Sequence, residues 1–243
     1  MRHGLLTTSA LALTLTACGG GTTEQTTTTT TARRTREPTA EEQAQADAQA
    51  GVQIEGLMGT ISQRQVNDTL QPRVESAFGP CFAHASDVHF LFGSIRLAFR
   101  IHTDGSVAWV YPSETTLGHR DVERCIADRA HGIHFPRPRG GEAEFSWEFH
   151  YDAPTDIRPP LSWDAARIAT LLSSNGGSLV SQCGGQRGYR VTAYVQSGGA
   201  VMSVGVAAQS TEAAAQLDCI ANGVSGWRMP DPGSYPAKIT FDL

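Results

Sequence analysis

An internal repeat is the feature that most constrains how this chain can fold. Residues 96–149 match residues 190–243 at a constant offset of 94, and the match needs no gap. The identical pairs include Arg96/Arg190, Gly105/Gly199, Val107/Val201, Val110/Val204, Cys125/Cys219, Gly132/Gly226, Pro136/Pro230 and Pro138/Pro232. Such self-similarity indicates a duplication, so we expect two tandem modules of one small fold, in residues 52–156 and 157–243.

Sequence patterns in the first module predict the order helix, hairpin, helix, strand. Ser62 is a typical helix N-cap, and apolar residues recur at every fourth position after it. An Asp-Gly pair between two alternating apolar segments is typical of a tight hairpin turn. The predicted elements are a helix over 63–78, strands over 95–102 and 106–111, a helix over 119–131 and a strand over 142–151. In the last strand we expect Ala143, Phe145, Trp147 and Phe149 to face the core.

The second module repeats this order. Ser162 is expected to cap a helix that ends at Leu172, a hairpin turns at 197–199, a helix runs over 211–219, and a strand over 237–243 ends the module. The predicted fold class is therefore α+β, with a three-stranded antiparallel sheet in each module.

The five cysteines fit this duplication. Each module has one cysteine in the shared segment and one upstream, which leaves Cys18 outside both modules. In an exported protein, cysteines at repeated positions indicate disulfides. We therefore expect bonds between Cys81 and Cys125 and between Cys183 and Cys219.

Residues 1–17 have the features of an export signal peptide. Arg2 supplies a positive charge, and an apolar stretch follows from Leu5 to Leu15. From Gly4 to Ala17 there are fourteen residues, whereas a membrane span needs roughly 20. The stretch ends in Leu15-Thr16-Ala17-Cys18, which resembles the lipobox of bacterial lipoproteins. The resemblance implies that Cys18 becomes the first residue and carries acyl chains such as palmitate. The alternative is an ordinary secretory signal with a chance cysteine.

The next segment, residues 18–51, is expected to be a disordered tether. It contains the unbroken threonine run 26–31 and a Glu- and Ala-rich stretch, neither of which can build a core. Gly19 after the lipidated cysteine resembles the outer-membrane sorting default, so we expect a lipid anchor in the outer membrane with the chain facing the periplasm. The formal net charge of −5 gives no basic footprint for nucleic acid.

Motifs in the first module resemble a known family. They are Gly59-Thr60-Ile61, Cys81, Gly93, Gly105-Ser106-Val107, Val122-Glu123-Arg124-Cys125 and Phe135-Pro136-Arg137-Pro138. Together they resemble the AgmX/PglI C-terminal domain, a relative of the TonB C-terminal domain found in myxobacterial envelope and gliding-motility proteins. The second module departs from the motif at Met229-Pro230-Asp231-Pro232, so its membership depends on the repeat. The resemblance implies a fold and a compartment, without a defined ligand or cofactor.

A partner is expected to bind the first module, which has the bulkier and more charged surface. The candidate binding residues are Arg96, Arg100, His102, Trp109, Arg137 and Arg139. A three-stranded sheet has open edges that can recruit an extended peptide by main-chain hydrogen bonds, and TonB-like domains are known for such pairing. The alternative is that the two modules pair edge to edge in one continuous sheet.

Two other functional classes stay open. Seven of the eight histidines lie between His84 and His150, and the spacing from Cys81 to His84 could suit zinc, which would make the chain a metal-binding periplasmic protein. The other class is a cryptic hydrolase. We favour a non-catalytic interaction or structural module, because no Gly-x-Ser-x-Gly, His-Glu-x-x-His or phosphate-binding glycine loop occurs.

Overall fold

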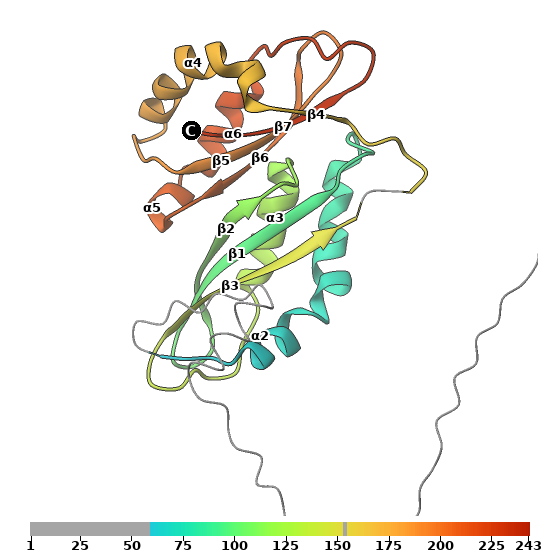
Figure 1. The fold of residues 1–243 in the computed structure, drawn as a ribbon. Helices are drawn as coiled ribbons and strands as arrows, with labels where there is room; N and C mark the ends of the chain where they lie inside the picture. Colours follow the sequence, from blue (N-terminus) through green and yellow to red (C-terminus); the bar gives the residue numbers. More distant parts are fainter. Residues whose placement is uncertain (1–58, 153–154) are drawn as a thin grey trace, which may run out of the picture. The chain divides into compact units, whose positions relative to one another are not determined.

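A computed structural model describes residues 59–152 and 155–243, which form a mixed α+β structure with two sheets (Figure 1). The signal peptide, Cys18 and the tether lie outside these described residues. The first sheet is antiparallel and contains β1 (Gly93–Ile101), β2 (Val107–Thr115) and β3 (Ala143–Tyr151) in the order β2-β1-β3. The three strands predicted for the first module are thereby confirmed.

One face of the first sheet forms the hydrophobic core with the helices of the same half, and the other face carries more exposed side chains. On β3, the four predicted inward residues Ala143, Phe145, Trp147 and Phe149 are buried, and they alternate with more exposed polar residues. On β1, Ile95, Leu97, Phe99 and Ile101 are all fully buried. This alternation follows from the two-residue period of a strand, which sends successive side chains to opposite faces.

The first helical segment begins as predicted but is interrupted. Helix α2 (Gln63–Leu70) is capped by Ser62, whose hydroxyl accepts a hydrogen bond from the Gln65 N–H. The expected continuous helix to residue 78 is wrong, since α2 ends before Pro72, and a π-helical turn over Val74–Phe78 and a 3₁₀ helix over Gly79–Ala85 follow. A proline has no N–H to donate and its ring clashes with the carbonyl of the residue four positions earlier, so regular α-helix stops there.

The second helix of this half is α3 (Arg120–His131), close to the predicted range. A disulfide joins Cys125 on α3 to Cys81 on the 3₁₀ helix, as the repeated cysteine positions predict. After α3, the chain runs back beside the hairpin: the Phe135 N–H donates to the Gly105 carbonyl at 2.9 Å. A Cβ on Gly105 would lie 2.1 Å from the Phe135 oxygen, and Gly105 has φ +95°, so only glycine fits this approach.

The second sheet differs from the prediction because it has four strands. They are β4 (Leu161–Trp163), β5 (Tyr189–Val195), β6 (Val201–Ala208) and β7 (Ala237–Asp242), in the order β4-β7-β5-β6. The additional strand β4 runs parallel to β7.

Ser162, the expected helix cap, therefore lies in a strand, and the prediction of a helix from Ser162 to Leu172 is wrong. The cap is Asp164, whose Oδ1 accepts from the Ala166 N–H at 2.7 Å. Strand β4 follows Pro159 and Pro160 directly, and a residue before a proline disfavours helical backbone, so no helix leads into this segment.

The helices of the second half are α4 (Ala169–Gln182), α5 (Thr211–Ala214) and α6 (Leu217–Ser225). A 3₁₀ turn over Ala165–Ile168 leads into α4. The helix predicted over 211–219 is divided between α5 and α6, and Ser210 caps α5 through a hydrogen bond from the Ala213 N–H. The predicted disulfide between Cys183 and Cys219 is present and joins the end of α4 to α6.

Two hydrophobic cores underlie the two sheets, and the described strands do not form one continuous sheet. The face of the second sheet that points away from its own core contacts the first half of the chain. Thr192 on β5 donates a hydrogen bond to the Thr115 carbonyl at 3.2 Å, and Tyr194 donates to the Phe92 carbonyl at 3.3 Å. Tyr194 is fully buried and packs into the first core.

Candidate interaction surface on the first sheet

The face of the first sheet that points away from the core, called the open face below, brings polar and aromatic side chains together. Its central strand β1 contributes Arg96, Ala98 and Arg100, all of which are partly exposed. The other contributions are Trp109, Tyr111, Ser113 and Glu114 from β2, and Glu144, Ser146 and Glu148 from β3. The strand register determines which of these side chains meet, because antiparallel partners on the same face lie beside one another.

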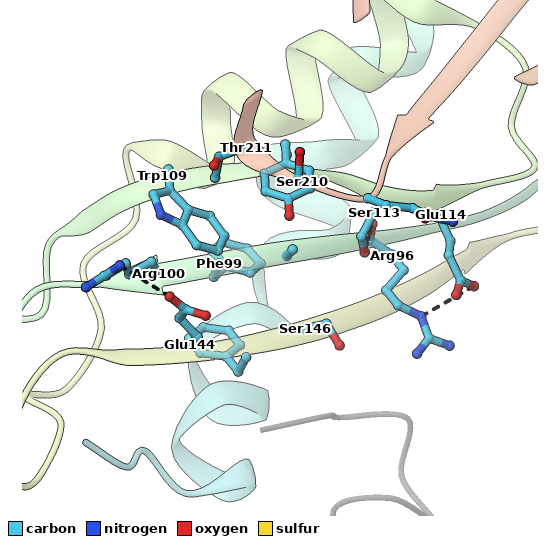
Figure 2. Close-up of a pocket in the computed structure, with 14 residues that line it drawn as sticks. Arg96, Phe99, Arg100, Trp109, Ser113, Glu114, Glu144, Ser146, Ser210 and Thr211 are labelled. Atoms are coloured by element: carbon cyan, nitrogen blue, oxygen red, sulfur yellow. Dashed lines mark hydrogen bonds and ion pairs between the residues drawn. The ribbon is translucent and has the colours of Figure 1, made fainter. Parts of the chain in front are cut away.

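Both arginines of the open face are held by carboxylates across the sheet. The Arg96 Nη2 atom lies 2.7 Å from the Glu148 Oε2 atom, and the Arg96 Nε atom lies 3.7 Å from Glu114 Oε2. The Arg100 Nε atom lies 2.7 Å from Glu142 Oε2, and its Nη1 atom lies 3.4 Å from Glu144 Oε1 (Figure 2). Each guanidinium is therefore fixed in position, although partly exposed pairs of this kind add little stability.

His102 reaches the same cluster through Glu142. The His102 Nδ1 atom lies 2.6 Å from Glu142 Oε1. This hydrogen bond and the one from Arg100 hold the pKa of the Glu142 carboxyl below its usual value. Glu142 thus stays ionised and links His102 to Arg100 at one end of the open face.

A hollow of about 480 Å³ lies on the open face between the two arginine clusters. Ala98 and Ser146 line it between Arg96 and Arg100, and the rings of Trp109 and Tyr111, 5.3 Å apart, line it from β2. Ser210 and Thr211, at the start of α5, complete the lining near Trp109 (Figure 2).

Two polar atoms at this hollow lack hydrogen-bond partners. Ser146 Oγ and Arg96 Nε are shielded from solvent, yet neither has a hydrogen-bond partner among the described residues. A shielded polar atom without a partner costs free energy. Arg96 Nε still lies 3.7 Å from a carboxylate oxygen of Glu114, so Ser146 Oγ is the less satisfied of the two atoms.

The structure unites only part of the predicted set of binding residues. Arg96, Arg100 and Trp109 line one hollow, and His102 joins them through Glu142. Arg137 and Arg139 are exposed but do not line it. Arg139 lies in the segment after α3, where its backbone exchanges two hydrogen bonds of 2.8 Å with Thr60.

Sequence reasoning missed the acidic half of this surface. Glu144 and Glu148 alternate outward on β3 and are absent from the predicted binding residues, whereas both pair with arginines of β1. The alternating pattern shows that they share a face, but only the register between β1 and β3 shows which arginine each one meets. Ser210 and Thr211 come from the other half of the chain and carry no local signal.

The edges of the first sheet differ. Strand β2 contacts β6 of the second sheet, whereas β3, which is nine residues long, has β1 as its only strand neighbour within the described ranges. An unpaired edge presents alternate N–H and C=O groups to its surroundings. Strand β3 is therefore the edge of this sheet that pairs with no second strand among the described residues.

One of the candidate zinc ligands, Cys81, is not available to bind a metal. Cys81, four positions before the end of the 3₁₀ helix, forms a disulfide and so has no free thiolate. Among residues 59–152 and 155–243, no three His, Cys, Asp or Glu side chains gather in a way that could hold a metal ion. No helix in the same ranges is long and apolar enough to cross a membrane.

No family model, curated protein or solved structure matches this chain. The resemblance to the AgmX/PglI C-terminal domain therefore stays a prediction.

Proposed function

We propose that the chain is a lipid-anchored protein of the cell envelope whose folded part is a non-catalytic interaction module. In this proposal residues 1–17 are removed, Cys18 carries the lipid, and residues 18–51 hold the folded part away from the membrane. Two disulfides support export, because such bonds persist in oxidising compartments and are rare in the cytosol.

The folded part is proposed to be two tandem modules that arose by duplication. Details of the backbone support this. The isolated bridges Ser106↔His134 and Ala200↔Arg228 are related by the offset of 94, which also relates the sheet irregularities at Arg100/Ile101 and Tyr194/Val195. Irregularities are costly local features, so their recurrence at matched positions favours a common origin.

The residues of the open face are the main support for the proposal that this protein binds a partner. Arginine and tryptophan are enriched where protein partners bind, and here they flank a hollow in which the Ser146 hydroxyl oxygen has no hydrogen-bond partner among the described residues. The guanidiniums are already oriented by glutamates, so little side-chain freedom is lost when a partner arrives. The partner is proposed to be an envelope protein that contributes an extended segment.

The outer edge of β3, which pairs with no other strand of residues 59–152 and 155–243, supports the same mode of binding. A segment that pairs with β3 by main-chain hydrogen bonds would place its alternate side chains beside Glu144, Ser146 and Glu148 on the open face. Specificity would come from the open face, and affinity from the strand pairing. This arrangement uses the first module, as its charge and bulk predict.

Two experiments test the anchor and the surface separately. Cys18→Ser should leave the protein as an unprocessed or soluble precursor in fractionated cells, and a membrane-bound variant would refute the anchor. Trp109→Ala should lower retention of an envelope partner by the purified full chain, whereas Arg187→Ala, which removes an exposed side chain far along the sequence, should not. Equal retention by both variants would exclude the open face.

A further inference from the structure

Lys238 is the only lysine of this chain, which has 18 arginines (19 basic residues less one). It lies on β7, and its side chain is partly buried at the contact between the second sheet and Phe92. The choice of lysine at this position matters chemically, because an amine can lose its proton and act as a nucleophile near neutral pH, whereas a guanidinium cannot.

The surroundings of the Lys238 amine contain no carboxylate partner among the described residues. The Nζ atom donates a hydrogen bond to the Phe92 carbonyl at 2.5 Å, and it lies 4.0 Å from the centre of the Phe92 ring and 5.2 Å from that of Tyr194. The rings attract the ammonium through their π faces, but they supply no full negative charge. Burial prevails and lowers the pKa of Lys238 to about 8.

This amine lines a pocket of about 690 Å³. Its apolar lining consists of Phe92, Pro159, Pro160, Trp163 and Ala165, and its hydroxyl groups come from Thr116, Ser162 and Thr240. The one acidic residue in the lining, Asp164, uses its Oδ1 atom to cap the following helical turn. A concave apolar lining with a few polar groups and one reactive side chain is the usual composition of a small-molecule site.

We propose that this pocket is a site for small aldehydes, in which Lys238 Nζ forms an imine with the carbonyl carbon of a ligand whose apolar body lies against Trp163 and the two prolines. The neutral amine adds its lone pair to the carbonyl carbon. The nitrogen then gives up its two protons to the carbonyl oxygen, which leaves as water, and a C=N bond remains. The step needs no oxidant or reductant, and a desolvated lysine is the nucleophile that such condensations use.

The test compares Lys238 with an exposed control lysine introduced into the same protein. The full-chain variant Arg187→Lys carries a second amine at an exposed position. It is treated with benzaldehyde and cyanoborohydride at pH 7, which reduces each imine to a stable adduct. Peptide mass spectrometry then compares the two lysines and separates both from the α-amino group. We expect Lys238 to be modified roughly tenfold faster than residue 187, because much more of its amine is unprotonated, and its rate should saturate with benzaldehyde.

Comparable rates at the two lysines, or a rate at Lys238 that rises linearly with benzaldehyde, would overturn the proposal. A second variant tests entry through the pocket. Ser162→Trp, made together with Arg187→Lys, fills the pocket from an exposed strand position. It should reduce modification of Lys238 to the level of residue 187 while leaving residue 187 unchanged, and unchanged modification of Lys238 would show that the pocket does not hold the aldehyde.

Discussion

The Oε2 atom of Glu123 accepts a hydrogen bond from the backbone N–H of Val206 at 2.9 Å, which joins helix α3 of the first half to strand β6 of the second. The other carboxylate oxygen accepts from the Thr115 hydroxyl at 2.8 Å, and the Glu123 side chain is fully buried. The contact between the halves therefore includes a buried acid with both oxygens hydrogen-bonded.

Removal of this side chain should weaken the fold. Glu123→Ala leaves the Val206 N–H buried without an acceptor, which costs about 1–3 kcal/mol of unfolding free energy. Chemical denaturation measures the loss, with Glu75→Ala as the control because Glu75 is exposed. A loss for Glu123→Ala no larger than that for Glu75→Ala would contradict a structural role for this contact.

The same residue should give stability a characteristic dependence on pH. Burial raises the pKa of Glu123, against the opposing hydrogen bonds from Thr115 and Val206. Because the folded-state pKa exceeds the unfolded one, the contribution is full at pH below the unfolded pKa and is lost as pH rises through the folded pKa. The unfolding free energies of the wild type and Glu123→Gln are measured at several pH values between 4 and 8. The value for the wild type should fall relative to that for the variant as pH rises. A constant difference would exclude this linkage.

Gly205 faces Glu123 and should not tolerate a side chain. A Cβ there would lie 2.0 Å from Glu123 Oε1 and 2.7 Å from the Gly118 Cα atom. Gly205→Ala should therefore cost about 1–3 kcal/mol through overpacking. The matched control is Gly177→Ala, which meets no atom within 4 Å inside α4 and should stabilise the protein by about 0.5–1 kcal/mol. Thermal unfolding of both variants checks the pair, and equal shifts would contradict the close contact at Gly205.

Pro136 and Pro138 are expected to act through structure. They restrict the chain just after Phe135 bonds to Gly105 and just before Arg139 bonds to Thr60. Replacing both with Ala frees the unfolded chain and should cost about 0.4–1 kcal/mol per residue, seen as a lower melting temperature. Unchanged stability with loss of partner binding would make this segment a binding site instead of a joint.

The sequence predicts elements better than it predicts contacts between them. The alternation of Phe145 and Trp147 with polar residues correctly placed β3, and the repeat correctly paired the cysteines. Ser162 was mistaken for a cap because serine precedes many helices, while the two prolines before it favoured an extended chain.

Contacts between residues that lie far apart in the sequence could not be predicted from local sequence patterns. The pairing of Arg100 with Glu144 needs the register of β1 and β3. The burial of Glu123 needs the approach of Val206 on β6, which lies 83 residues later. Polar residues on a helix are usually solvated, so nothing in the sequence of α3 distinguishes Glu123 from its exposed neighbour Arg124.

Site-specific photo-cross-linking in cells tests the proposed interaction most directly. A photoreactive amino acid at Glu114, on the exposed rim of the open face, is compared with the same amino acid at Arg187. The proposal predicts a discrete adduct with one envelope protein from position 114, lost when Trp109→Ala is added, and none from position 187. The absence of an adduct at 114, or the same adduct from both positions, would contradict partner binding at the open face.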